Sequence, residues 1–329
     1  MKYFVTGATG FIGKRVAQQL TAAGHEVIAL VRTPAKATNL AQHGVTLAQG
    51  DITDKESMRA PMTGVDGVFH IAGWYEVGTK DKTPGERINI QGTRNVLEMM
   101  RELNIPKGVY TSTLAVNSDT HGQVVDENYH FTGQHISEYD RTKAVAHQDV
   151  AEPMIKAGLP LAIASPGLVY GSGDHSNVRT TLQGYLQRRL PMIPQKTGYC
   201  WAHVDDIAAG HVQAMEKGII GETYFICGPT YTLVEALQMA QRITGIPVPM
   251  AVPPALFSIS AAMTGIVERF VTLPPLYTAE GLRVAAGVTY FGSNAKAKRE
   301  LGFDPRPLEV GLRELLRYEM TELGMKPNF

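Results

Sequence analysis

Short apolar runs alternate with helical patterns through the first half of the chain. The runs are typical of buried strands and cover residues 2–6, 26–32, 45–51, 67–73, 108–113 and 160–171, the last passing into a loop. The clearest helical patterns lie at 11–24, where Gly24 ends the helix, and at 88–103. Because the runs are apolar throughout rather than alternating, both faces of their sheet are expected to be covered. The pattern predicts an α/β fold with a doubly wound, Rossmann-type parallel sheet and right-handed crossovers.

The second half of the chain is less regular and richer in proline and glycine. Its patterns predict helices over residues 203–218, 232–245 and 308–324. Asp205 or Asp206 lies at the start of the first, where a carboxylate can cap free amides. Thr232 and Glu235 form a capping box at the start of the second, and Gly245 ends it.

We therefore expect two parts: a dinucleotide-binding domain over 1–170, and a smaller, mainly substrate-binding cap over 171–329, some segments of which return to the first domain. The most apolar stretch, 253–267, begins with prolines and is too short to span a bilayer. A helix packed under a lid or at a subunit contact explains it best. A helix lying on a membrane surface is the alternative, which the lack of a lysine-rich polar face disfavours.

Composition narrows the function classes. The 31 basic and 31 acidic residues cancel, which argues against the basic face of a nucleic-acid-binding protein. The chain holds two cysteines, Cys200 and Cys227, which are expected to be free, buried thiols in a reducing compartment. Since residues 1–7 enter a strand at once, they leave no room for a signal peptide. We expect a cytoplasmic protein with neither a nucleic-acid nor a membrane partner.

A glycine loop follows the first predicted strand. Gly7, Gly10 and Gly13 in "TGATGFIG" are spaced three apart, whereas the common dinucleotide pattern is G-x-G-x-x-G. The context is nevertheless strand, glycine turn and helix, in which backbone amides can approach a pyrophosphate at the helix N-terminus. The loop therefore predicts a bound dinucleotide.

The end of the second strand indicates which dinucleotide binds. NAD sites usually carry an acidic residue there, about 20 residues after the glycines, for the ribose 2′-hydroxyl. This chain has Arg32 at that place, with Lys36 nearby and no acid between Glu26 and Asp51. Arginine suits the extra phosphate of NADP. NADP is therefore preferred and NAD less favoured, unless Arg32 is only a solvated surface residue.

Tyr139 and Lys143 in "EYDRTK" are four residues apart and share a helix face. A nearby ammonium, with the positive ring of an oxidised nicotinamide, would favour phenolate and bring the phenol pKa into a useful range. The fifth strand ends in three hydroxyl residues, Thr111, Ser112 and Thr113. A hydroxyl there could hold a substrate oxygen while Tyr139 moves a proton, although strand threonines are also common without such a role.

These motifs resemble the extended branch of the short-chain dehydrogenase/reductase family, also called the NAD-dependent epimerase/dehydratase family. The resemblance covers nearly the whole chain and rests on "TGATGFIG", "GDITD", "FHIAG", "INIQGTRNVLE", "VYTST", "YDRTK", "SPGLVYG" and "HVDDIAAGH". Within the family it is similar to the dihydroflavonol-reductase-like members and the related bacterial sugar epimerases.

The resemblance implies roles for individual residues. Thr113 takes the place of the catalytic Ser/Thr, with the adjacent Ser112 as the alternative one residue away. Tyr139 is implied as the acid/base, and Lys143 as its electrostatic partner and ribose ligand. The other implied cofactor contacts are Thr9, Phe11 and Ile12 in the glycine loop, Asp51 and Ile52 at the adenine, Ala72 and Gly73 at the diphosphate and ribose, and Pro166, Leu168 and Val169 at the carboxamide.

Two departures from the family pattern bear on the reaction. The family's sugar dehydratases carry an Asp-Glu pair after the catalytic threonine, whereas Leu114 and Ala115 follow Thr113 here. Many of its nucleotide-sugar epimerases carry an asparagine in the loop after the sixth strand. The "SPGLVYG" of this chain has none, which makes a nucleotide-sugar substrate less favoured.

Two further pairs of residues allow more than one interpretation. His203 and Asp205 could suggest metal ligands, but no third ligand is in sequence reach, so a helix cap is the better interpretation and no metal is expected. Trp74 and Tyr75 follow the fourth strand and could either line a substrate pocket or simply pack.

The leading hypothesis is an NADP(H)-dependent oxidoreductase that moves a hydride between nicotinamide and a carbonyl or secondary alcohol of a small molecule with an apolar body. A sugar epimerase with a retained cofactor and a non-catalytic, cofactor-dependent sensor are the alternatives. The sequence is compatible with a homodimer and does not identify the substrate.

Overall fold

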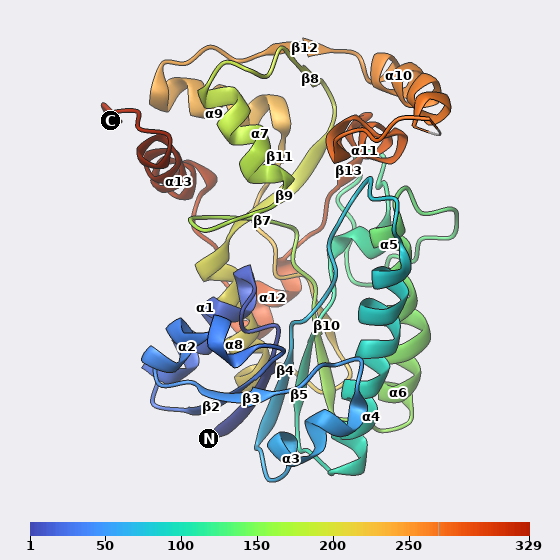
Figure 1. Ribbon diagram of the computed structural model, residues 1–329, viewed down its shortest axis with the longest axis vertical. Helices are drawn as coiled ribbons and strands as arrows, with labels where there is room; N and C mark the ends of the chain where they lie inside the picture. The colour runs from blue at the N-terminus through green and yellow to red at the C-terminus, as the bar shows by residue number, and fades with distance from the viewer. Residues whose placement is uncertain (269) are drawn as a thin grey trace.

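A parallel sheet forms the centre of the fold, as the sequence predicts. The computed structural model describes residues 1–268 and 270–329 (Figure 1). The sheet has the order β10-β6-β5-β4-β1-β2-β3. Its strands are β1 (Lys2–Thr6), β2 (Glu26–Val31), β3 (Thr46–Gln49), β4 (Gly67–His70), β5 (Gly108–Thr111), β6 (Leu161–Ala164) and β10 (Thr223–Tyr224). The order 3-2-1-4-5-6 is that of dinucleotide-binding sheets, with β10 added at one edge.

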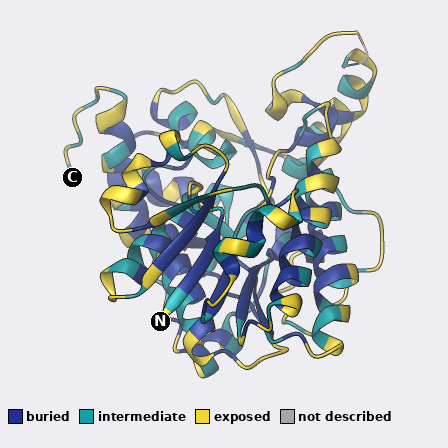
Figure 2. Cartoon of the chain, turned by 60° about the horizontal axis from the view of Figure 1, so that its bottom comes forward, coloured by how far each residue is buried: buried dark blue, intermediate teal, exposed yellow. Residues whose placement is uncertain are grey.

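Helices cover both faces of this sheet, which explains why its strands are apolar throughout. One face carries α1 (Phe11–Ala22), η1 (Pro34–Lys36), α2 (Thr38–Gln42), α8 (Val204–Lys217) and α12 (Ala295–Leu301). The other carries η2 (Lys55–Met58), α3 (Arg59–Met62), η3 (Gly85–Gly92), α4 (Thr93–Glu102), α5 (Glu138–Val145), η5 (Ala146–Ala151) and α6 (Glu152–Lys156). Figure 2 shows the strands as the most buried part of the molecule.

The cap stands over the carboxyl ends of the parallel strands (Figure 1). Its strands are β7 (Leu168–Tyr170), β9 (Gly198–His203), β11 (Thr230–Thr232) and β13 (Thr289–Tyr290), with a separate pair of β8 (Met192–Pro194) and β12 (Met250–Val252). Its helices are α7 (Asn177–Leu186), α9 (Leu233–Thr244), α10 (Pro254–Val267), η6 (Pro275–Tyr277), α11 (Ala279–Ala285) and α13 (Leu308–Glu322), while η4 (Leu114–Asn117) follows β5. Three elements from the second half of the chain, α8, β10 and α12, pack with the parallel sheet.

The start of α8 corrects the predicted cap. The helix begins at Val204, so His203 is the N-cap, and its Nδ1 accepts a hydrogen bond from the amide of Asp205 at 3.3 Å. Burial lowers the pKa of His203, which favours the neutral ring that this acceptor role needs. Asp205 and Asp206 lie in the first turn and pair with Arg15 and Arg306. Asp205 and Asp206 therefore do not cap the helix. They lie in its first turn, where the helix dipole stabilises negative charge.

Other local predictions are confirmed. Thr232 caps α9 with a complete capping box to Glu235, and Gly245 ends the helix with a φ of 73°. Cys200 and Cys227 are free and buried.

Helix α10 matches the apolar stretch predicted at 253–267, but it packs less than expected. Ala261 is its buried residue, while Ile259, Met263 and Ile266 are 58%, 66% and 63% exposed. Leu256, Phe257, Ser260 and Thr264 line the large cavity described below. Among the helices that the structure describes, none is long and apolar enough to cross a membrane.

The capping box gives a stability prediction. Thr232→Ala leaves the amide of Glu235 without its 3.2 Å partner. The free energy of unfolding should therefore fall by about 1 kcal/mol in denaturant titrations. The matched control is Ser258→Ala at an exposed position of α10, which should change it by less than about 0.5 kcal/mol. Equal effects of the two substitutions would contradict the capping role.

Candidate active site

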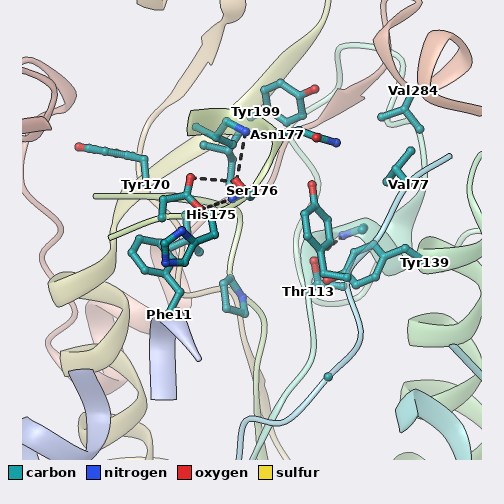
Figure 3. Close-up of a pocket in the computed structure, with 18 of the residues that line it drawn as sticks. Phe11, Val77, Thr113, Tyr139, Tyr170, His175, Ser176, Asn177, Tyr199 and Val284 are labelled. Atoms are coloured by element: carbon teal, nitrogen blue, oxygen red, sulfur yellow. Dashed lines mark hydrogen bonds between the residues drawn. The ribbon is translucent and has the colours of Figure 1, made fainter. Parts of the chain in front are cut away.

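A large cavity lies between the carboxyl edge of the parallel sheet and the cap (Figure 3). Its volume of about 1220 Å³ exceeds the ~300–1,000 Å³ typical of one small-molecule site, so it has room for a cofactor and a substrate together. All predicted site residues except Lys36 line it: Gly7, Thr9, Gly10, Phe11, Ile12, Gly13, Arg32, Asp51, Ile52, Ala72, Gly73, Trp74, Tyr75, Ser112, Thr113, Tyr139, Lys143, Pro166, Leu168 and Val169.

The glycine loop is packed too closely for side chains. Gly7 has a φ of +74°, and a Cβ there would lie 2.6 Å from the amide nitrogen of Ala72. A Cβ on Gly13 would lie 2.2 Å from the carbonyl oxygen of Gly7. Helix α1 therefore starts against the loop, with Gly10 as an N-cap that offers no side-chain bond and no acid in its first turn. Its free amides suit the diphosphate of a dinucleotide.

The ends of β2 and β3 form the part of the wall where the sequence predicts the adenosine. Arg32 follows β2 and is exposed at the cavity wall. Asp51 accepts hydrogen bonds from the amide and hydroxyl of Thr53 at 2.9 and 3.0 Å, so its position is fixed. Lys36 belongs to the exposed η1 and is not in the cavity wall, which leaves Arg32 as the cation at the predicted 2′-phosphate position.

The turn after β4 is held by Asn89, which the sequence reasoning missed. The Asn89 side chain accepts from the amide of Trp74 at 2.7 Å and donates to its carbonyl at 3.0 Å. It also donates to the hydroxyl of Thr142 on α5 at 3.0 Å. Asn89 thus fixes the turn containing Gly73 relative to the helix that carries Tyr139. The available signal was a polar amide inside the predicted helix "INIQGTRN".

Thr113 and Ser112 point to different partners. The Ser112 hydroxyl is hydrogen-bonded to Nδ1 of the buried His147 at 2.7 Å. The Thr113 hydroxyl accepts from the amide of Ala115 at 3.2 Å, and it lies close enough to the Tyr139 phenol to lower the pKa of that phenol. Figure 3 shows the side chains of Thr113 and Tyr139 close together. The geometry therefore favours Thr113 over Ser112 as the hydroxyl that acts with Tyr139.

The electrostatics of Tyr139 differ from the expectation. Burial raises the pKa of the phenol well above its usual range, and the nearby Thr113 hydroxyl opposes this only in part. The hydrogen bonds of Lys143 go to other acceptors: its Nζ donates to the carbonyl of Thr111 at 2.7 Å and to the Tyr110 hydroxyl at 3.1 Å. Burial lowers the pKa of Lys143 to about 7. Sequence spacing shows a shared helix face, but it cannot show burial or competing acceptors.

The loop that follows β6 contacts both the end of β5 and the cap. The carbonyl of Pro166 accepts from the amide of Leu114, next to Thr113, at 2.9 Å. Beyond it, Leu168 and Val169 belong to β7, which pairs with β9 of the cap. The loop therefore connects the end of β5 with the cap.

A second group of polar residues near Tyr139 was not predicted. The buried Asp140 accepts from the hydroxyls of Ser137 at 2.7 Å and Tyr290 at 2.9 Å. Burial raises the pKa of Asp140 to about 6. The ring of Tyr290 stacks on that of Tyr199 at 6.0 Å between centroids. Asp140, Tyr199 and Tyr290 all line the cavity. This pairing joins segments far apart in the chain, so no local motif signals it.

The two aromatic residues after β4 both reach the cavity. Trp74 is buried, whereas Tyr75 is 50% exposed and meets the ring of Tyr139 edge-on at 4.8 Å between centroids. Val77 and Val284 approach the same end of the cavity (Figure 3). Contact of Trp74 and Tyr75 with a substrate stays a prediction.

Charge is unevenly distributed around the cavity. The lysine and arginine residues in its described wall are Arg32, Arg87 and Lys143, all from the first half of the chain. Between residue 171 and the end of the described chain, the wall contains no lysine or arginine and is mainly hydrocarbon and aromatic. Among the described residues, no group of three or more His, Cys, Asp and Glu side chains could hold a metal ion.

Comparison with known proteins agrees with this geometry. Residues 3–227 match the model of the NAD dependent epimerase/dehydratase family. A Synechocystis protein named after dihydroflavonol 4-reductase is 30% identical, over 96% of this chain and 94% of its own. Sterol demethylase protein B of Methylococcus capsulatus is 30% identical over 99% of this chain and 100% of its own.

A solved structure extends the agreement to three dimensions. The crystal structure of gox2253 superposes with a TM-score of 0.86 at 30% identity, and covers 98% of this chain and 99% of its own. Fold, site geometry and sequence thus agree: the chain belongs to the NAD-dependent epimerase/dehydratase family, the extended short-chain dehydrogenases/reductases, and is an NAD(P)-dependent enzyme of that family.

Proposed function

We propose that the protein is an NADP(H)-dependent carbonyl reductase, and in the reverse direction an alcohol dehydrogenase, for substrates with an apolar body. The nicotinamide, when bound, would supply or accept a hydride at the substrate carbon. Thr113, Tyr139 and Lys143 are the residues proposed to act on the substrate and the cofactor.

The residue roles follow from their protonation states. Because burial keeps Tyr139 protonated at neutral pH, its phenol can donate a proton to a carbonyl oxygen as that oxygen gains negative charge. Thr113, which lines the cavity beside the same phenol, would hold the oxygen in place. Lys143 would support the phenol electrostatically and contact the cofactor ribose.

The observation that carries the choice of reaction is the lack of lysine and arginine in the described cavity wall of the cap. A nucleotide sugar brings a diphosphate, and proteins commonly bind phosphate with arginine or lysine. The described wall beyond residue 170 offers neither. Its aromatic and aliphatic side chains, among them Leu182, Ile193 and Phe257, suit a lipophilic ketone or alcohol instead.

One experiment separates the candidate reactions. The purified protein is incubated with NADPH and a panel of lipophilic ketones, and in parallel with UDP-sugars, while absorbance at the reduced nicotinamide band and sugar isomers are followed. A reductase consumes NADPH in step with ketone loss. Isomerisation of a sugar without net cofactor change would establish the epimerase instead. Cofactor binding without any turnover would favour the sensor.

We expect Arg32 to set the cofactor preference. NADPH should bind more tightly than NADH to the wild type, and Arg32→Asp should flatten or reverse that ratio because the carboxylate repels the 2′-phosphate. Fluorescence titration measures both dissociation constants. Lys36→Asp makes the same charge change outside the cavity wall and should have a smaller effect. A wild type that prefers NADH would refute the NADP assignment.

Tyr139→Phe should lower kcat by roughly 10²–10⁴-fold, because it removes the proton donor. NADPH affinity should stay close to that of the wild type, as measured by titration of the same preparation. Lys143→Met should differ by weakening turnover and NADPH binding together. If Tyr139→Phe keeps most of its activity, the proposed acid is wrong.

Thr113→Val keeps the volume and β-branching while it deletes the hydroxyl. It should lower kcat/KM by about tenfold or more, whereas Thr113→Ser should keep much of the activity. Ser112→Ala is the matched control, because its hydroxyl bonds His147 rather than the phenol, and its effect should be mild. Steady-state kinetics with intact NADPH binding decide the comparison. If Ser112→Ala lowers kcat/KM more than Thr113→Val does, Ser112 rather than Thr113 is the hydroxyl that acts with Tyr139.

A further inference from the structure

Lys143, the lysine of the proposed catalytic site, contacts Tyr110, a tyrosine with no role in the proposed reaction. Lys143 Nζ donates to the phenol oxygen of Tyr110 at 3.1 Å and lies 4.7 Å above the centroid of the same ring. Its other hydrogen-bond acceptor is the carbonyl oxygen of Thr111 at 2.7 Å. Both Lys143 and Tyr110 are buried, so the ammonium depends on these contacts in place of water.

Tyr110 is itself held by a buried chain of hydrogen bonds. Its phenol lies close enough to the hydroxyl of Thr93 for that hydroxyl to lower the phenol pKa. Its ring stacks on the ring of His70, with 5.4 Å between centroids and 21° between planes. His70 bridges the hydroxyls of Thr93 at 3.0 Å and Thr6 at 2.8 Å. The chain therefore connects β5, α4, β4 and β1.

The far end of this chain lies in the proposed cofactor site. The Thr6 hydroxyl accepts from the backbone amides of Ile71 and Ala72, each at 3.2 Å. Two accepted bonds leave its proton for Nδ1 of His70, so Nε2 carries the ring proton and donates to Thr93. Ala72 is the residue against which Gly7 packs. One buried network thus fixes both the lysine and the turn beside the glycine loop.

We propose that Tyr110 is a positioning residue that holds Lys143 charged and in place in the wall of the proposed cofactor site. The inference rests on the proposed function for the role of Lys143. Without the phenol, the ammonium keeps only the carbonyl of Thr111, and its charged form loses stabilisation that a charge-assisted hydrogen bond supplies.

The neighbours of Lys143 determine the sign of the pH effect. The titratable side chains around it are Tyr110 on β5, His70 on β4, His147 on η5 and Tyr139 on α5. Burial lowers the pKa of His70 to about 3 and that of His147 to about 4, so both stay neutral above pH 5, and neither supplies an anion. With the pKa of Lys143 already lowered to about 7, loss of the phenol acceptor lowers it further.

The test is Tyr110→Phe, which keeps the ring and deletes the hydroxyl. The high-pH limb of kcat/KM for ketone reduction should move to lower pH by about one unit, because Lys143 loses its proton earlier. The NADPH dissociation constant, titrated across pH 6–9, should rise about tenfold at the upper end for the same reason. That titration needs no turnover, so it tests the inference even if no ketone is reduced.

Tyr224→Phe is the matched control. Tyr224 is a buried tyrosine of the same sheet, and Lys296 lies 4.9 Å above its ring. Unlike Lys143, Lys296 does not line the cavity. Substitution of Tyr224 should leave both pH curves unchanged. If Tyr110→Phe does not fold, Thr93→Val loosens the same phenol and should shift both curves in the same direction by less. The proposal would be overturned if folded Tyr110→Phe or Thr93→Val showed the wild-type pH dependence of kcat/KM and of the NADPH dissociation constant.

Discussion

The close approach of the glycine loop to the turn after β4 is the constraint on which the rest of the site depends. Gly7 fits only because it lacks a Cβ that would meet the backbone of Ala72, and Gly13 fits only because it lacks one that would meet Gly7. These contacts bring the N-terminus of α1 against the ends of β1 and β4. The free amides of that helix then face the cavity, where the dipole favours an anion.

Parallel strand direction extends this arrangement to the chemistry. Since β1, β4, β5 and β6 run the same way, their last residues share one edge of the sheet. Thr6, Thr111 and Ser112 each use a hydroxyl to hold a buried histidine, at 2.8, 2.9 and 2.7 Å. The Thr113 hydroxyl instead lies near the phenol of Tyr139, whose pKa it lowers. One edge thus carries both the hydroxyls that hold the histidines and the hydroxyl proposed to act on the substrate.

The sequence predicted those features that local spacing encodes. Apolar runs located the strands, the glycines located the loop, and Tyr139 and Lys143 were correctly placed on one helix face. Interactions between distant segments were not predictable. Asn89 joins the turn at Trp74 to α5, and Asp140 meets Tyr290, 150 residues away. The cap of α8 was assigned to an aspartate because "HVDD" offers several cap residues, and only the backbone shows that the helix starts at Val204.

Burial determines the protonation states of Tyr139 and Lys143, and with them the direction of proton transfer that the site favours. From spacing alone, a lysine four residues from a tyrosine should favour phenolate. In the folded chain both groups are buried, and burial penalises the charged form of each: the pKa of Tyr139 rises and that of Lys143 falls. The neighbouring histidines are neutral for the same reason. At neutral pH the site therefore holds a protonated phenol, which matches proton donation to a carbonyl oxygen during reduction. In the oxidation direction the phenol would first have to lose its proton, so added positive charge near it would be needed to lower its pKa.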